Sequence, residues 1–156
     1  MPTTFLEWME LLSYVATVVG IPFALWTFIV QEKKERQNEQ EEIYDKLMDH
    51  YAEIQEKLFE YPELDEHDKP LFDPEAARRQ QILYEMLTSL FERAFILLES
   101  ETDPAYRRMW NSWLDYIDLW SKRPNYREAL PRLMHGEDPH FTKFMADLTG
   151  MDLQCR

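Results

Sequence analysis

Glycine is scarce in this chain of 156 residues, with only 3 present, whereas proline occurs 9 times. Tight hairpin turns and phosphate-binding loops both depend on glycine, because its missing side chain permits positive φ and a close backbone approach. The chain also has a single cysteine, Cys155, so no intramolecular disulfide can form. All-β folds and glycine-loop nucleotide sites are therefore poorly supported, and a reducing compartment is the simpler assumption.

Positive charge is scarce in the first half of the chain. Residues 1–77 hold 6 basic and 18 acidic side chains, a net charge of −12, while residues 78–156 hold 11 and 12, a net charge of −1. Nine of the 11 basic residues in the second half are Arg, whose planar guanidinium suits phosphate and aromatic contacts better than Lys does. The acidity argues against nucleic-acid binding by the whole chain but not by its second half.

Residues 11–30, LLSYVATVVGIPFALWTFIV, contain no charge. Twenty helical residues at about 1.5 Å each cover the roughly 30 Å hydrocarbon core of a bilayer, so we predict one transmembrane helix. A cleaved signal peptide is the competing interpretation, but no basic residue precedes the run and no small-residue cleavage pattern follows it. Lys33, Lys34 and Arg36 come next, which places the C-terminal side in the cytoplasm and leaves residues 1–10 as a short extracytoplasmic tail.

Small and polar residues within this run recur at steps of three and four, which places them on one face of the helix. Such a face packs closely against other membrane helices, or lines a pore if several copies assemble with it inward. We predict a homo-oligomer, with about four copies as the smallest number that encloses a water path. A hinge is expected at Gly20 and Pro22, because Pro22 lacks a backbone N–H. The predicted pore-lining residues are Ser13, Thr17, Gly20, Ala24 and Thr27.

Beyond the span, residues 31–60 are polar at first and then carry apolar residues at helical spacing, which predicts an acidic stalk helix. Residues 61–156 are expected to form a cytosolic helical domain. The chain is therefore predicted to be all-α, with one transmembrane helix continuing into a helical bundle. Asp followed by Pro, a strong helix start, occurs three times in the last domain. The predicted helices cover about 74–100, 104–122, 124–135 and 139–148, with Gly150 as the final stop.

Catalytic and metal-binding patterns are poorly represented. The one Glu-x-x-His pair, Glu137 and His140, spans a Pro at a predicted helix start, whereas di-iron sites use such pairs within helices. A single Cys near the C-terminus cannot supply a thiolate cluster. We therefore expect no enzyme activity, no cofactor and no metal.

Arg residues close to aromatic residues in the second half favour binding of phosphates and bases. Two Arg pairs fall near the starts of predicted helices, where backbone N–H groups already favour anions. Two Trp residues follow the second pair, although packing in a core also explains them, and salt bridges to the acidic stalk also explain the Arg residues. The candidate ligand-binding residues are Arg78, Arg79, Arg107, Arg108, Trp110, Trp113, Arg123 and Arg127.

The stretches GIPFALWTF, EKKERQNEQEEIYDKL, YPELD and FERAFILL lie within about residues 18–98 and resemble small bacterial proteins with one N-terminal span and a cytosolic helical domain. Within that group the chain is most similar to membrane effectors of the Hailong antiphage defence system. This resemblance implies a homo-oligomeric ion channel of the inner membrane, held closed by a single-stranded DNA oligomer that a nucleotidyltransferase encoded nearby makes. Loss of the oligomer would then depolarise the membrane.

Two alternatives remain open. Effectors opened by a cyclic oligonucleotide from a CRISPR system have a similar build. A non-conducting, membrane-anchored helical module for protein interactions would need no pore and no nucleic acid.

Overall fold

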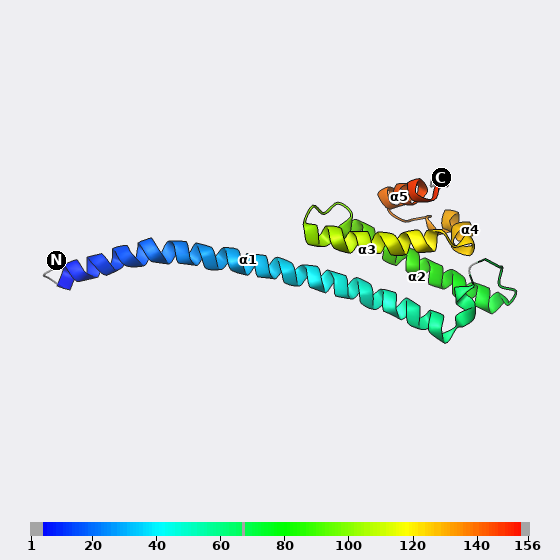
Figure 1. Cartoon of the computed structure of the whole chain (residues 1–156), viewed down its shortest axis with the longest axis horizontal. Coiled ribbons are helices and arrows are strands. Elements are labelled where there is room, and N and C mark those ends of the chain that lie inside the picture. The colour runs from blue at the N-terminus through cyan, green and yellow to red at the C-terminus, as the bar shows by residue number, and fades with distance from the viewer. Residues whose placement is uncertain (1–4, 67, 154–156) are drawn as a thin grey trace. The chain divides into compact units, whose positions relative to one another are not determined.

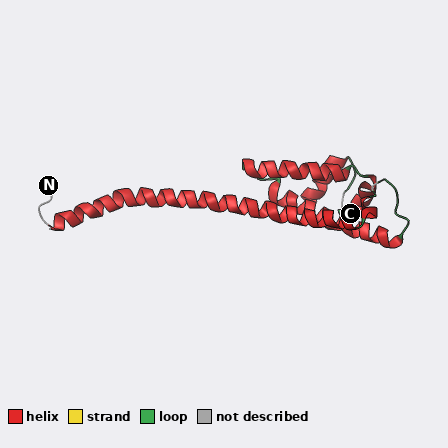
Figure 2. Cartoon of the chain, turned by 60° about the horizontal axis from the view of Figure 1, so that its bottom comes forward, coloured by secondary structure: helices red, strands yellow, loops and turns green. Residues whose placement is uncertain are grey.

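The computed structural model describes residues 5–66 and 68–153, without the side chains of residues 6, 7, 10–12 and 15–17. All regular structure in these ranges is helical, with five α-helices and one short 3-10 helix (Figure 2). The all-α class is thereby confirmed. The chain divides into two compact units, residues 1–42 and residues 43–156, and each is described by itself.

The first helix, α1 (Phe5–Glu60), provides the described part of the first unit and continues into the second. It remains helical through Pro22, where a hinge is predicted. Among the described residues, and apart from the backbone of its own helix, a Cβ added at Gly20 would meet no atom within 4 Å, so a larger side chain has space there. The hinge itself stays a prediction.

The predicted pore-lining face is described in part. Ser13, Gly20 and Ala24 are exposed, and Thr27 is half-buried. The Thr27 hydroxyl donates a hydrogen bond of 2.8 Å to the Ala24 carbonyl, which satisfies it within its own helix. The side chain of Thr17 lies outside the described residues.

A search of the described residues finds no helix that is both long and apolar enough to cross a membrane. The predicted span, residues 11–30, falls partly outside them, because residues 11, 12 and 15–17 are among the undescribed side chains.

The second unit contains four complete helices after the end of α1 and a 3-10 helix, η1 (Pro62–Asp65). Each predicted helix begins at the expected Pro, and each end lies within two residues of its predicted position. At Asp73, Asp103 and Asp138 the carboxylate accepts backbone N–H groups of the first turn, which confirms the predicted helix starts. The bounds are α2 (Pro74–Leu98), α3 (Pro104–Ser121), α4 (Pro124–Leu133) and α5 (Pro139–Thr149).

Helix α5 ends at Gly150, as predicted. Gly150 has a φ of 68° and its N–H bonds the Ala146 carbonyl. That left-handed backbone conformation favours glycine, because a Cβ would collide with the following carbonyl.

The core of the second unit is built around α2, which packs against α3, α4, α5 and η1 (Figure 1). The end of α1 also contributes, since its Leu47, Tyr51, Ile54 and Leu58 are buried in the same cluster. The compact unit therefore begins at Ile43, whereas we expected residues 31–60 to form a stalk outside it. The apolar residues that resume at helical spacing after residue 42 are the signal for this packing.

Candidate functional site

The predicted ligand-binding residues do not converge on one site. Arg78 and Arg79 lie near the start of α2, whereas Arg107 and Arg108 lie near the start of α3. Arg107 Nη1 contacts the carbonyl of Glu99, just past the C-terminus of α2, at 3.5 Å. The two pairs are therefore separated by most of the length of α2, which at about 1.5 Å per residue amounts to roughly 30 Å.

Both predicted stacking rings belong to the core. Trp113 is fully buried, and its ring centroid lies 5.9 Å from that of Tyr51 and 6.3 Å from that of Phe91. Trp110 is buried against Phe95, with centroids 5.9 Å apart. A ring enclosed by protein offers no face to a nucleobase, so the assignment of these two Trp residues to a ligand site is wrong. Their common helical face was the signal for packing.

The Arg123 side chain binds to other residues of the same unit. Its Nη1 lies 2.6 Å from Asp65 Oδ1, and its guanidinium carbon lies 3.8 Å from the centroid of the Trp120 ring. An ion pair and a cation–π contact on one half-buried side chain position η1 against the end of α3. We therefore assign Arg123 to the structure of the unit.

Arg127 bonds two helix ends. Its guanidinium donates to the carbonyls of Ser121 at 3.4 Å and Thr149 at 3.0 Å, at the last residues of α3 and α5. Helix C-termini carry carbonyls without intrahelical partners and a partial negative charge, and the half-buried Arg127 cation satisfies both. Arg127 thus holds helices together.

Four of the predicted ligand-binding Arg residues are exposed. They are Arg78, Arg107, Arg108 and Arg79, and Arg79 also lines a pocket. Arg108 also borders a shallow hollow of about 220 Å³ with Tyr44 and Met109. Arg107 and Arg108 follow each other in the sequence near the start of α3, where the helix dipole favours anions.

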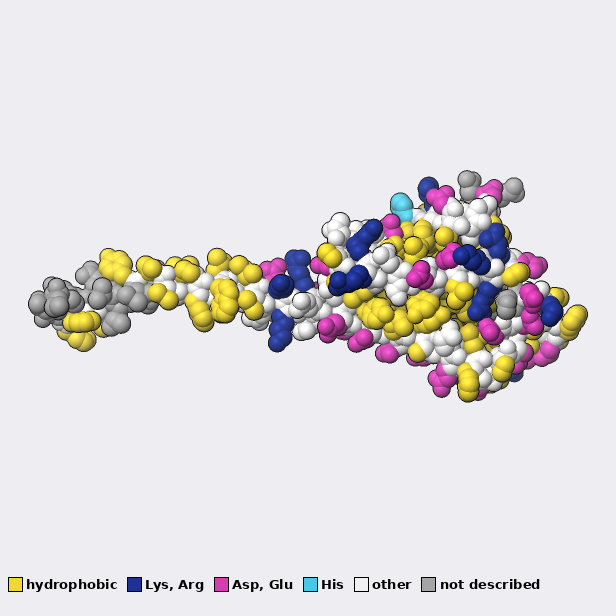
Figure 3. Space-filling model, viewed as in Figure 1, with side chains coloured by type: hydrophobic (Ala, Val, Ile, Leu, Met, Phe, Trp, Pro, Cys, Tyr) yellow, Lys and Arg dark blue, Asp and Glu magenta, His cyan; other side chains and the backbone are white. Residues whose placement is uncertain are grey.

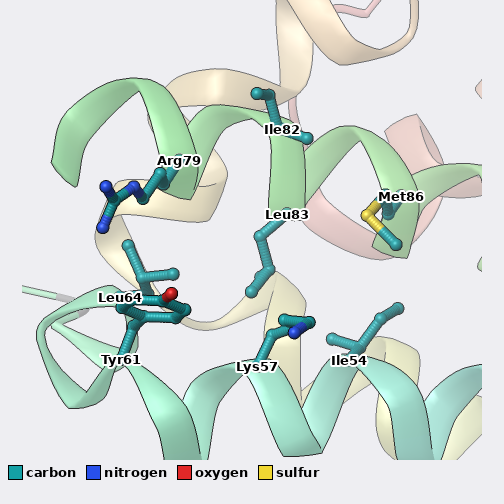
Figure 4. A pocket seen from close by; sticks show the side chains of 8 residues that line it. All are labelled: Ile54, Lys57, Tyr61, Leu64, Arg79, Ile82, Leu83 and Met86. Carbon is teal, nitrogen blue, oxygen red and sulfur yellow. The ribbon is translucent and has the colours of Figure 1, made fainter. Parts of the chain in front are cut away.

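An apolar pocket opens between the end of α1, η1 and α2 (Figure 4), with a volume of about 170 Å³. Its floor is buried aliphatic surface from Ile54, Leu64 and Leu83. The Arg79 guanidinium carbon lies 5.0 Å from the centroid of the Tyr61 ring at one end. The complete lining is Ile54, Lys57, Tyr61, Leu64, Arg79, Ile82, Leu83 and Met86.

This pocket continues along α1 and α2 into a second hollow of about 190 Å³, which shares Ile54 and Met86 with it. The second hollow is lined by His50, Glu53, Ile54, Met86, Ser89, Leu90 and Arg93. We call the two together the α1/α2 groove. On its α2 wall, Ile82 and Met86 are 46% and 48% exposed.

Of the residues that line the groove, only Arg79 was among the candidate ligand-binding residues predicted from the sequence. Ile82, Met86 and Arg93 follow Arg79 at steps of three, four and seven, which places them on one helical face. The sequence pattern does not distinguish this face from the core face of α2, because both faces contain apolar residues at helical spacing. Which face α1 leaves open depends on contacts between distant segments.

A carboxyl pair links α2 to the start of α5. Glu92 accepts the backbone N–H of Asp138, the N-cap of α5, and its side chain is also hydrogen-bonded to that of Glu137. Burial, then the hydrogen bond and charge of Glu92, raise the pKa of Glu137 to about 7. The pair is best satisfied when one proton is shared between the two carboxyl groups.

We expect Glu137→Gln to stabilise the protein at pH 8 by about 1 kcal/mol, a value reduced for solvent screening at this half-buried site. Folding raises the pKa of Glu137 from 4.5 to about 7. Between these two pH values the folded chain therefore keeps a proton that the unfolded chain has already lost. Stability therefore falls as pH rises through that window. The amide keeps the hydrogen bond without the charge, so the gain should nearly vanish at pH 5.

Urea unfolding at pH 5 and pH 8 measures this difference. Glu128→Gln, an exposed carboxyl on α4, is the matched control and should change stability equally at both pH values. An equal effect of Glu137→Gln at the two pH values would contradict the shared-proton arrangement.

No group of three or more His, Cys, Asp or Glu side chains within residues 5–66 and 68–153 is arranged to hold a metal ion. Cys155 lies outside the described residues. Comparisons with known protein families, with curated proteins and with solved structures found no match to this chain. The function is therefore argued from the chain's own residues.

Proposed function

We propose that this chain is a non-catalytic, homo-oligomeric membrane effector of bacterial antiphage defence. Its N-terminal helices would form an ion channel of the inner membrane, gated by an oligonucleotide bound to residues 43–156. The observation that carries the proposal is the uncharged run of residues 11–30, which belongs to the same continuous helix as the start of the second unit.

Membrane anchoring is supported by the surface of α1 between residues 18 and 30. Large apolar side chains in this stretch are about half exposed or more, and apolar surface on this scale needs a cover such as lipid or other helices. Figure 3 shows these side chains giving way to Lys and Arg farther along the chain. Lys33, Lys34 and Arg36 support a cytoplasmic C-terminal side, and the acidic residues that follow would concentrate cations at the channel mouth.

Ligand binding is supported by the exposed Arg pair at the start of α3. Arg107 and Arg108 are exposed near the N-terminus of that helix, where an anion would be stabilised by their charge and by the helix dipole. The burial of Trp110 and Trp113 removes base stacking from the site, so phosphates are the groups it would recognise.

Liposomes containing the purified full-length chain should pass K⁺ but little Cl⁻, because the mouth of the proposed channel is acidic. Ion flux with a K⁺-sensitive dye, with and without oligonucleotides, measures this. Vesicles that remain tight under every condition would contradict the channel, whereas a leak that passes large dyes would indicate membrane disruption instead.

Short single-stranded DNA should bind the full-length chain with an affinity that falls as salt rises. Replacing both Arg107 and Arg108 by Ala should reduce the logarithmic salt slope by about 1.4, since each lost phosphate contact contributes roughly 0.7. Fluorescence anisotropy at several salt concentrations measures the slope. Lys143→Ala, an exposed cation on α5, is the control and should leave the slope unchanged, while an unchanged slope in the double variant would remove both Arg residues from the site.

One observation favours a non-conducting interaction module as the second candidate. The α1/α2 groove exposes Ile82 and Met86 beside cations, a surface typical of protein contacts. That candidate predicts no flux and no DNA binding, together with a monomer or dimer in detergent.

A further inference from the structure

A polar groove with a volume of about 360 Å³ lies between α2 and α4. Small-molecule sites have volumes from about 300 Å³ upwards, so a small ligand fits there. Lining residues of each helix follow steps of three and four, which place them on one helical face. Ala77 on α2 and Ala129 on α4 are small and leave the space between the helices open. We call this the α2/α4 groove, and its polar walls are Gln80, Tyr84, Asn125, Glu128 and Arg132.

Two carboxamide groups in the groove keep their oxygen atoms available. Gln80 Nε2 donates hydrogen bonds to the carbonyls of Leu64 at 3.0 Å and Glu66 at 2.8 Å. Asn125 Nδ2 donates to the carbonyls of Glu66 at 3.0 Å and Lys69 at 2.9 Å. Only the amide nitrogen can donate to two carbonyls, so the orientation of both carboxamides is fixed and their N–H donors are used. Within the described ranges, Gln80 Oε1 and Asn125 Oδ1 have no hydrogen-bond partner.

The Tyr84 hydroxyl is a third polar group in the groove without a partner among the described residues. Tyr84 is only 3% exposed and Gln80 only 8%, and burial raises the pKa of Tyr84 to about 12. The unbonded side-chain atoms that the described protein encloses completely are Trp113 Nε1, Ser121 Oγ and Thr142 Oγ1. The Tyr84 hydroxyl and Gln80 Oε1 are not among them, so they open into the groove that both residues line. Buried polar groups of this kind need a water or a ligand as partner.

The α4 wall adds a carboxylate and a guanidinium that do not bond each other. Glu128 and Arg132 are exposed and four residues apart, with the acid first, an arrangement that favours an ion pair on a helix. Asp118 and Lys122, in the same order and spacing, do form one. Among the residues that the structure describes, neither Glu128 nor Arg132 has an ion-pair partner. One charge of each sign is therefore available at the groove.

We propose that the α2/α4 groove binds a free α-amino acid. An ammonium group carries three N–H donors, which match the three acceptors Gln80 Oε1, Asn125 Oδ1 and the Glu128 carboxylate. The planar guanidinium of Arg132 binds the carboxylate of the ligand, and the Tyr84 hydroxyl donates to it. The groove and the ligand each contribute one positive and one negative charge, so every charge has a partner in the complex.

This site differs from the one proposed for oligonucleotide phosphates. The groove uses the first half of α2 together with α4, whereas Arg107 and Arg108 lie near the start of α3. A phosphate group also lacks N–H donors, so it would bind Arg132 and leave the carboxamide oxygens without partners. The inference therefore goes beyond the proposed channel and does not depend on it.

Isothermal titration calorimetry of the full-length chain in detergent tests the proposal, with each of the common L-amino acids as the probe. At least one of them is expected to bind with a dissociation constant below about 1 mM. The matching amine without the carboxylate, and the matching acid without the ammonium group, should each bind at least about tenfold more weakly. Each of these analogues leaves one side of the site unbound.

Variants of the groove locate the binding. Glu128→Gln and Arg132→Gln should each weaken it at least about tenfold, and because both residues are exposed the fold should be retained. Tyr84→Phe should weaken it to a smaller extent, since one neutral hydrogen bond is lost. Lys122→Gln is the control, an exposed cation outside the groove, and should leave the affinity unchanged.

Three results would overturn the proposal. The first is that no amino acid binds at about 10 mM. The second is an affinity that Glu128→Gln and Arg132→Gln leave unchanged, which would place the amino acid elsewhere. The third is that inorganic phosphate or a nucleoside monophosphate binds through Arg132 while no amino acid does, which would assign the groove to a phosphate ligand.

Discussion

Replacing Trp113 by Ala should destabilise the second unit by about 3–5 kcal/mol, the range for deletion of a large buried aromatic side chain. The ring is fully enclosed among the aromatic rings of Tyr51, Phe91 and Tyr116. Its Nε1 has no hydrogen-bond partner among the described residues, so the loss comes from packing and not from a broken hydrogen bond. Because the free energy of unfolding of a small domain is only about 5–15 kcal/mol, this change would remove a large part of it.

Urea unfolding of the full-length chain in mild detergent, followed by circular dichroism, measures the effect. Leu119→Ala is the matched control on the same helix, because Leu119 is 52% exposed and should cost less than about 1 kcal/mol. The same pair of variants tests the role in ligand binding. If Trp113→Ala left stability intact and abolished DNA binding, its assignment to the core would be contradicted.

A Lys placed at Val19 should raise the cost of membrane insertion by about 3 kcal/mol, which is the scale for a charge near the centre of a transmembrane helix. A Lys at the adjacent Gly20 is expected to behave differently in the proposed channel. Gly20 lies on the small and polar face, where a pore would offer water, and the structure leaves space for a side chain there. Gly20→Lys should therefore insert and suppress cation flux.

Two measurements separate these outcomes. The fraction of chain that stays with membranes after an alkaline wash reports insertion, and K⁺ flux in liposomes reports conduction. Val19→Leu and Gly20→Ala are the size controls and should preserve both. Equal loss of membrane association by the two Lys variants would show that Gly20 faces lipid or tightly packed helix, which would contradict its place in the pore.

The helix positions in the second unit could be predicted because their signals are local. The carboxylates of Asp73, Asp103 and Asp138 accept backbone N–H groups from residues two or three positions later, and the Pro that follows each Asp presets the helical φ. Gly150 ends α5 by a backbone conformation that is a property of the residue itself. No distant contact is needed for any of these interactions.

The candidate site could be predicted only in part, because its residues act through distant contacts. Arg107 and Arg108 remain exposed as expected, whereas Arg123 is held by Asp65, 58 residues earlier in the chain. The sequence does not show whether an Arg beside a Trp faces solvent or an internal carboxylate. That choice depends on which segments the fold brings together.

The sequence by itself determined the all-α class, the starts of α2 to α5, the uncharged run of residues 11–30 and the charge difference between the halves. These properties are set by neighbouring residues or by composition. Only the tertiary structure decided that Trp110 and Trp113 are enclosed, that residues 43–60 join the core, and that α1 and α2 leave a groove between them. Burial depends on which helical faces meet, and several apolar faces of these helices satisfy the same periodicity.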